Sequence, residues 1–209
     1  MRTRFLAAPF AILAFVAASP ARQVVGGPDP DRKASSVHVS SASFETLAAV
    51  SISHGQASWR ESYDGMLETL KGSHYTRLGT GWWATFDTVG AVEVGGTTIE
   101  AGSYYLGLAV DREGAFSLLL FNSMQAMKAA LLPGTTALYT GAAMPSARAP
   151  LVLARDSLKE AAIKLAIEIT ADPKDPATGK LSIRWGRHEL SAAVRFQLAT
   201  AKDVGSPKK

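Results

Sequence analysis

The chain has 209 residues, of which 47% are hydrophobic and 19% charged, with a formal net charge of +4 at pH 7 and no cysteine. This apolar content excludes an intrinsically disordered chain, and the lack of cysteine excludes disulfides, thiolate metal sites and cysteine nucleophiles. The length accommodates one domain.

The first 21 residues have the layout of a signal peptide. Arg2 and Arg4 precede an apolar run over residues 6–18, and Ser19-Pro20-Ala21 supplies small residues for cleavage after Ala21. The run is short for a membrane span, so an uncleaved anchor is the weaker alternative. We therefore expect export to the periplasm or the extracellular space as a soluble protein, without stable membrane insertion.

The charge balance argues against a nucleic-acid partner. Removal of residues 1–21 takes away two arginines and no acidic residue, which lowers the formal charge from +4 to +2. No cluster of Lys and Arg alternates with aromatic residues, as a nucleic-acid groove requires.

The next segments are expected to be a leader followed by short strands. Residues 22–36 are rich in Gly, Pro, Asp and Ser and predict a flexible leader. Strands are expected at 36–40, where Val37 and Val39 share a face, and at 48–53, where apolar and small residues alternate. A short helix is expected at 66–71.

The middle of the chain predicts consecutive hairpins. Gly95-Gly96 is a two-residue hairpin turn, and the surrounding extended segments are 83–88, 91–94, 97–100, 104–110 and 115–121. A helix is expected over residues 123–132, followed by a short extended piece at 136–140.

The last third contains one ambiguous segment. Propensity favours a helix at its start, 159–162. However, Ile163, Leu165, Ile167 and Ile169 alternate strictly with other residues, and this period of two predicts a strand over 163–170. Further strands are expected at 151–155, 181–185 and 190–198, the last two as an antiparallel hairpin.

Short strands at roughly ten-residue spacing predict an all-β fold. We expect an antiparallel β-sandwich or barrel-like domain with one or two short helices. It would span residues 37–200 as a single domain and be followed by a disordered tail over 201–209.

Residues 50–198 resemble the bacterial domain-of-unknown-function family 2911. The likeness is carried by Arg77-Leu78-Gly79, Val92-Glu93-Val94-Gly95-Gly96, Ala101-Gly102-Ser103-Tyr104-Tyr105-Leu106, Leu118–Asn122 and Leu181-Ser182-Ile183-Arg184-Trp185. Members of that family are commonly exported and have no established activity. The resemblance therefore implies the fold and the export, and it implies no reaction.

The chain departs from the family pattern at one place. Ungapped alignment puts Gly81 and Trp82 where the family has an Asn-Glu pair, and Thr76 where it has a tryptophan. If the Asn-Glu pair carries an activity or binds a ligand, this chain has lost or changed it.

The sequence contains no recognised catalytic or metal-binding motif. The histidines are His38, His54, His74 and His188, and no two lie within ten residues of each other. We therefore expect no metal, no cofactor and no identifiable catalytic residue. A hydrolase would have to draw on His54, His74, Glu61, Asp64 and Glu68 in or beside the irregular 54–75 segment.

Aromatic residues mark the best candidate contact surface, which is the 54–83 region. Adjacent strand residues point to opposite faces, so one of Trp82 and Trp83 should be buried and the other exposed. An exposed tryptophan beside Arg77 can stack on a ring of a ligand. The candidate ligand-binding residues are Arg77, Trp82, Tyr75 and Trp59.

These observations favour an exported, non-catalytic binding module for a cell-envelope component. The partner would be a small molecule, a glycan or a protein. The alternatives are an envelope hydrolase that uses His and carboxylate residues of the 54–75 region, and a purely structural role.

Overall fold

The computed structural model describes residues 31–42, 45–63, 71–72, 76–132 and 143–198. The expected signal peptide, most of the expected leader, the C-terminal tail, nearly all of the helix expected at 66–71 and the extended piece at 136–140 lie outside these residues. Within them, no helix is long and apolar enough to cross a bilayer.

Within the described residues the chain is mostly antiparallel β-structure, as the alternating apolar patterns predict. A single α-helix and a 3-10 turn accompany the strands. In chain order the elements are β1 (Arg32–Ser40), β2 (Thr46–Gly55), η1 (Glu61–Tyr63), β3 (Thr76–Arg77), β4 (Thr85–Thr88), β5 (Val92–Val94), β6 (Thr97–Ile99), β7 (Gly102–Val110), β8 (Phe116–Asn122), α2 (Ser123–Lys128), β9 (Ala147–Ala154), β10 (Ala162–Ala171), β11 (Thr178–Gly186) and β12 (His188–Phe196).

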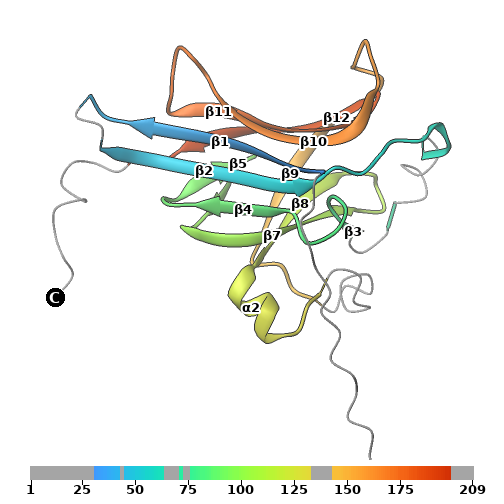
Figure 1. Ribbon diagram of the computed structural model, residues 1–209, viewed down its shortest axis with the longest axis horizontal. Helices are drawn as coiled ribbons and strands as arrows, with labels where there is room; N and C mark the ends of the chain where they lie inside the picture. Colours follow the sequence, from blue (N-terminus) through green and yellow to red (C-terminus); the bar gives the residue numbers. More distant parts are fainter. Residues whose placement is uncertain (1–30, 43–44, 64–70, 73–75, 133–142, 199–209) are drawn as a thin grey trace, which may run out of the picture.

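The strands form one sheet that is nearly closed into a barrel (Figure 1). Its main path runs β1-β2-β4-β7-β8-β9-β12-β11-β10, and β3, β5 and β6 pair beside this path. The first and last strands of the path, β1 and β10, lie against each other, and Figure 1 shows them side by side. The predicted choice between a sandwich and a barrel is therefore resolved in favour of a barrel-like sheet.

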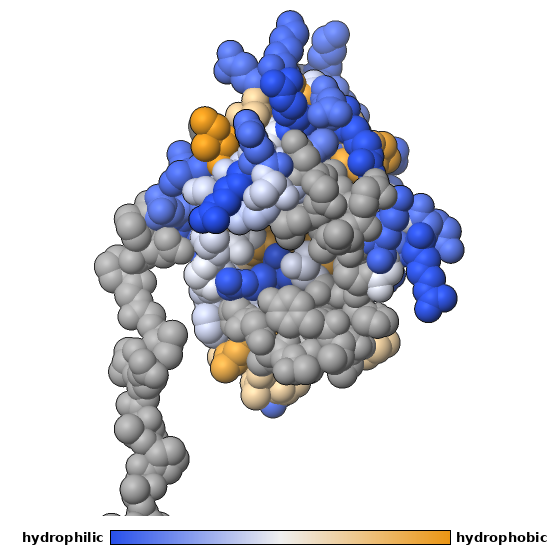
Figure 2. All heavy atoms as spheres, turned by 90° about the vertical axis from the view of Figure 1, so that its right-hand side faces the viewer, coloured by the Kyte–Doolittle hydropathy of each residue, from blue (hydrophilic) through white to orange (hydrophobic). Residues whose placement is uncertain are grey.

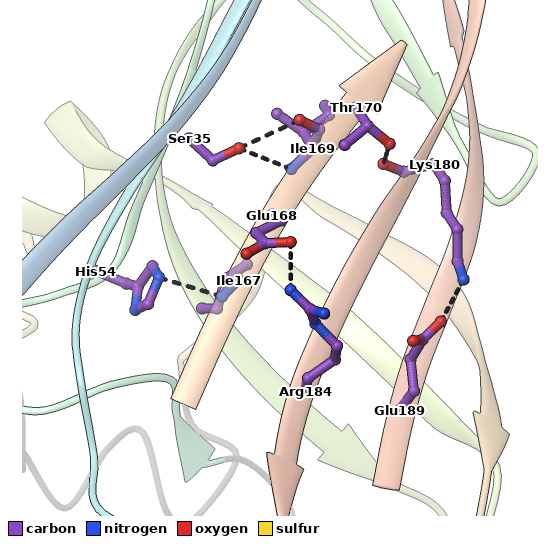
Figure 3. A network of polar contacts seen from close by, with 9 residues as sticks. All are labelled: Ser35, His54, Ile167, Glu168, Ile169, Thr170, Lys180, Arg184 and Glu189. Atoms are coloured by element: carbon purple, nitrogen blue, oxygen red, sulfur yellow. Dashed lines mark hydrogen bonds and ion pairs between the residues drawn. The ribbon is translucent and has the colours of Figure 1, made fainter. Parts of the chain in front are cut away.

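Side chains, rather than a regular backbone ladder, join β10 to β1 and β2 at this closure, here called the seam (Figure 3). Ser35 Oγ accepts a hydrogen bond from the Ile169 N–H at 3.1 Å and donates one to the Ile169 carbonyl at 3.2 Å. His54 Nε2 accepts one from the Ile167 N–H at 3.1 Å. The backbone groups on this edge of β10 thus obtain partners that a ladder would otherwise supply.

The seam continues toward the end of the barrel through main-chain bonds. The Leu165 N–H donates to the Ala57 carbonyl at 2.8 Å, and the Trp59 N–H donates to the Ile163 carbonyl at 2.6 Å. The segment after β2 therefore stays attached to β10, which fixes the position of Trp59.

The inward faces of the strands make the main core. On β2, Ala48, Val50, Ile52 and His54 are all buried because residues two apart share a face. Corresponding rows on the other strands complete an apolar interior, including Leu165, Ile167 and Ile169 of β10. The strand predicted from the alternation is thereby confirmed. Ile163, the first residue of the predicted buried face, is instead 72% exposed, because the register of β10 shifts between Ala162 and Ala166.

A second apolar cluster lies on the outer face of the sheet, where α2 covers β7 and β8. Its buried members are Trp83, Tyr105, Ala109, Leu119, Phe121, Ala126 and Leu131. The helix starts at an N-cap, because the Asn122 side chain accepts a hydrogen bond from the Gln125 N–H at 3.1 Å. It ends at Lys128, four residues before the predicted end of the helix.

The prediction of a flexible leader over residues 22–36 is wrong for its last five residues. β1 begins at Arg32, and residues 32–36 pair with Gly55 to Ser51 of β2. The Arg32 guanidinium also donates to Ser53 Oγ and to the Trp83 carbonyl, both at 2.8 Å. Polar composition suggested a linker at 32–36, but the edge of β2 and these hydrogen bonds hold those residues in the sheet.

Candidate functional site

A cavity of about 180 Å³ opens at the end of the barrel where β11 turns into β12. Figure 2 faces this end and shows hydrophilic side chains gathered over its upper part, with small areas of apolar surface near the centre. We call this space the end cavity. Its lining residues are Ala57, Trp59, Tyr63, Thr76, Arg77, Leu78, Gly79, Leu108, Phe116, Leu153, Leu165, Ile183, Trp185, His188 and Leu190.

Aromatic rings form one wall of the end cavity. Trp59 packs edge-on against Trp185, with ring centroids 5.0 Å apart, and against Tyr63 at 5.8 Å. Tyr63 also contacts Trp185 at 5.3 Å, and His188 lies 6.0 Å from Trp59. Such edge-to-face contacts are favourable and hold the rings in a defined arrangement.

Glycine at position 186 makes this wall possible. Gly186 has φ +63°, in the left-handed region that favours glycine. A Cβ built there would lie 2.4 Å from Cε2 of Trp59. The turn between β11 and β12 and the position of the Trp59 ring therefore depend on the same absent side chain.

Arg77 reaches the end cavity from β3. One of its guanidinium nitrogens, Nη1, donates to the Gly81 carbonyl. The turn that holds Gly81 rests on the end of β2, because the Thr80 N–H donates to the Gly55 carbonyl at 3.3 Å. A Cβ at Gly55 would lie 2.2 Å from the Thr80 oxygen, so this close approach requires glycine.

Two ring nitrogens add polar character to the wall. Trp185 Nε1 is buried and has no hydrogen-bond partner among the described residues, and an indole N–H acts only as a donor. His188 Nδ1 accepts a hydrogen bond from the Asp156 N–H at 3.3 Å. In the neutral ring this bond places the proton on Nε2. The indole nitrogen and the His188 Nε2 are therefore both donors.

The four predicted ligand-binding residues do not gather in one place. Trp59 and Arg77 both line the end cavity. Trp82 does not: it is 48% exposed and packs edge-on against Tyr105 at 6.4 Å, beside the outer cluster. Its neighbour Trp83 is fully buried, so the two tryptophans differ in exposure as predicted. They do not lie on opposite faces of a strand, however, because β4 begins only at Thr85 and both rings contact Tyr105. Tyr75 lies outside the described residues.

Sequence reasoning missed three residues of the aromatic wall, which are Tyr63, Trp185 and His188. Trp185 is in phase with the buried Leu181 and Ile183, so the pattern assigned it to the core. It is only partly buried because β11 ends one residue later. A tryptophan and a histidine on either side of a glycine turn were the available signal for a wall at the end of a hairpin.

Of the groups considered for a hydrolase, His54 and Glu61 are the ones that the structure describes. His54 is 2% exposed, and its Nδ1 lies 3.3 Å from the Gly55 carbonyl while Nε2 accepts from Ile167. Burial lowers the pKa of His54 below its usual value. Glu61 is exposed on η1, and His74, Asp64 and Glu68 lie outside the described residues. Among the described residues, no three His, Asp or Glu side chains converge as a metal site requires.

Comparisons with protein-family models, with characterised proteins and with solved structures found no match. The resemblance to family 2911 therefore stays a prediction. The arguments about function rest on the barrel and its end cavity.

Proposed function

We propose that the protein is an exported, non-catalytic binding module. Its site would be the end cavity, and its ligand a small, largely apolar molecule. The observation that carries this proposal is the position of a predominantly apolar, aromatic-walled cavity at the end of a barrel-like sheet. Ligand sites are typically concave and apolar with a few polar groups, and the mouths of barrels are among their usual places.

The size of the end cavity limits the ligand. A cavity of about 150 Å³ lined by apolar side chains is large enough for benzene. The end cavity, at about 180 Å³, therefore suits one six-membered ring with a short substituent. Among the possible partners, a small molecule fits better than a glycan, because the hydroxyl groups of a sugar need more hydrogen-bonding partners than these walls contain.

A cavity-filling substitution tests the proposal. Ala57 is partly buried and lines the end cavity, and its backbone contact to Leu165 does not depend on its side chain. Ala57→Met should fill the space and abolish the binding of 2-phenylethanol, measured by isothermal titration calorimetry or ligand-observed NMR. Ala193→Met makes the same chemical change at an exposed position of β12 and should leave binding intact.

Two results would contradict the proposal. One is an absence of binding by the parent protein to every single-ring compound up to its solubility. The other is binding that survives Ala57→Met unchanged, since the ligand would then sit elsewhere on the molecule.

A further inference from the structure

Resting on the proposed function, we propose that the ligand of the end cavity is a small carboxylate. Its apolar part would have about six to eight carbon atoms, and Arg77 would hold its charged group. The inference comes from two donor groups, on β3 and β11, that line the same apolar space.

Arg77 is the first of these groups. Its guanidinium carries five N–H donors, and the hydrogen bond found for it within the described residues is the one from Nη1 to Gly81. The ion pairs found there join other residues, such as Arg184 with Glu168, and no described carboxylate pairs with Arg77. Arg77 is half-buried beside apolar walls, and a carboxylate there can form charge-assisted hydrogen bonds with the guanidinium.

Trp185 is the second group. Its Nε1–H is buried without a partner among the described residues. A buried donor in that state has lost its hydrogen bonds to water and gained none from the protein, which costs free energy. A carboxylate has two oxygens that accept hydrogen bonds, so it can satisfy an indole N–H as well as a guanidinium. An amine, which only donates when charged, satisfies neither group.

The remaining walls define the apolar part of the ligand. Leu78, Leu108, Leu165 and Ile183 also line the space, and none of them offers a polar side-chain atom. The volume that admits one ring admits an aliphatic chain of similar carbon count. A ring carboxylate and a short-chain fatty acid therefore share the required chemistry, and the experiment has to distinguish them.

The experiment measures dissociation constants by calorimetry for four probes of similar size. Phenylacetate and hexanoate carry the carboxylate on a ring and on a chain, 2-phenylethanol is neutral, and 2-phenylethylamine is a cation. We expect phenylacetate or hexanoate to bind at least tenfold more tightly than 2-phenylethanol, and the amine to bind most weakly. The better of the two carboxylates identifies the apolar part.

Amino-acid substitutions test which residues cause the preference for a carboxylate. Arg77→Gln should weaken carboxylate binding at least tenfold and should weaken the binding of 2-phenylethanol by a clearly smaller factor. Urea unfolding of the variant like that of the parent shows that the barrel remains folded. Arg195→Gln removes an exposed arginine of β12 outside the cavity and should change nothing. Trp185→Phe keeps a ring but removes the N–H, and should weaken carboxylate binding by a smaller factor.

The outcomes separate the two proposals. If 2-phenylethanol binds as tightly as phenylacetate and hexanoate, or if Arg77→Gln leaves their binding unchanged, the carboxylate inference is overturned and the binding module stands. If none of the four probes binds, the proposed function fails, and the inference fails with it.

Discussion

His54 should make the seam of the barrel sensitive to acid. The Gly55 carbonyl can only accept a hydrogen bond, so the His54 proton resides on Nδ1, and the lone pair on Nε2 receives the Ile167 N–H. Protonation would place a second N–H against the Ile167 N–H. The native seam therefore requires the neutral ring, in agreement with the lowered pKa of His54.

Some features of the surroundings of His54 lower its pKa and others raise it. Burial is the main cause of the lowered pKa, and the cations of Arg32 and Lys33 lower it further. Glu168 and the hydrogen bond to Gly55 raise it, but they do not reverse the effect of burial.

The lowered pKa of His54 determines how the stability of the fold changes with pH. Because the folded protein holds the proton less well than the unfolded chain, acid favours unfolding. The contribution of His54 to the free energy of unfolding is complete above about pH 6.5, the ordinary pKa of histidine. Below that pH it falls, with a limiting slope of about 1.4 kcal/mol per pH unit, until the folded-state pKa is reached.

The test substitution is His54→Leu, which keeps a side chain of similar size and removes both hydrogen bonds. The buried Ile167 N–H then loses its partner, for which the expected cost at pH 8 is about 1–3 kcal/mol. Urea unfolding followed by tryptophan fluorescence at pH 8, 7, 6 and 5 measures it. The difference between parent and variant should shrink toward pH 5, because the variant lacks the titrating ring.

His38→Gln is the matched control, since His38 is an exposed histidine of β1 that contacts Thr46. It should leave the pH dependence of the parent unchanged. A stability difference between parent and His54→Leu that is the same at every pH would refute the reasoning, as would a difference near zero at pH 8.

Three further predictions concern stability, each measured as a change in the free energy of unfolding. Gly186→Ala should cost about 2–4 kcal/mol, since it combines a left-handed φ with overpacking, whereas Gly96→Ala, at φ +81° in open space, should cost only about 1 kcal/mol. Ser35→Ala should cost about 1–3 kcal/mol, because both backbone groups of β10 that its hydroxyl bonds lose their partner, while Ser36→Ala at the exposed neighbouring position should be nearly neutral. Asn122→Ala should cost about 1 kcal/mol through loss of the helix cap.

Each of these predictions has a contradicting outcome. Equal costs for the two glycine substitutions would show that the Trp59 ring relaxes away from the turn. Equal costs for the two serine substitutions would show that water replaces the Ser35 hydroxyl in the seam. A stable Asn122→Ala variant would show that packing alone maintains α2.

Local patterns in the sequence were sufficient to predict most strands. The alternation of Leu165, Ile167 and Ile169 identified β10 against its helical propensity, because burial on one face outweighs small differences in propensity. Gly95-Gly96 located the β5–β6 hairpin, and the adjacent Trp82 and Trp83 were correctly expected to differ in exposure. These features depend on neighbours within a few residues along the chain.

The start of β1 and the function of His54 depend on distant partners. Residues 32–36 have the composition of a linker, and they form a strand because β2 lies beside them. His54 occupies an inward-facing position that a pattern marks only as buried. Its role depends on Ile167, which is 113 residues further along the chain.

The sequence by itself determined the class of fold, because alternating burial and turn chemistry are local properties that each segment carries. It also singled out Trp59 and Arg77 as candidate contacts, from residue type and neighbourhood alone. Only the tertiary structure decided that these two share a cavity with Trp185, while Trp82 lies elsewhere. The physical reason is that a cavity is the space left between segments that are close only after the sheet curls, and no single segment encodes it.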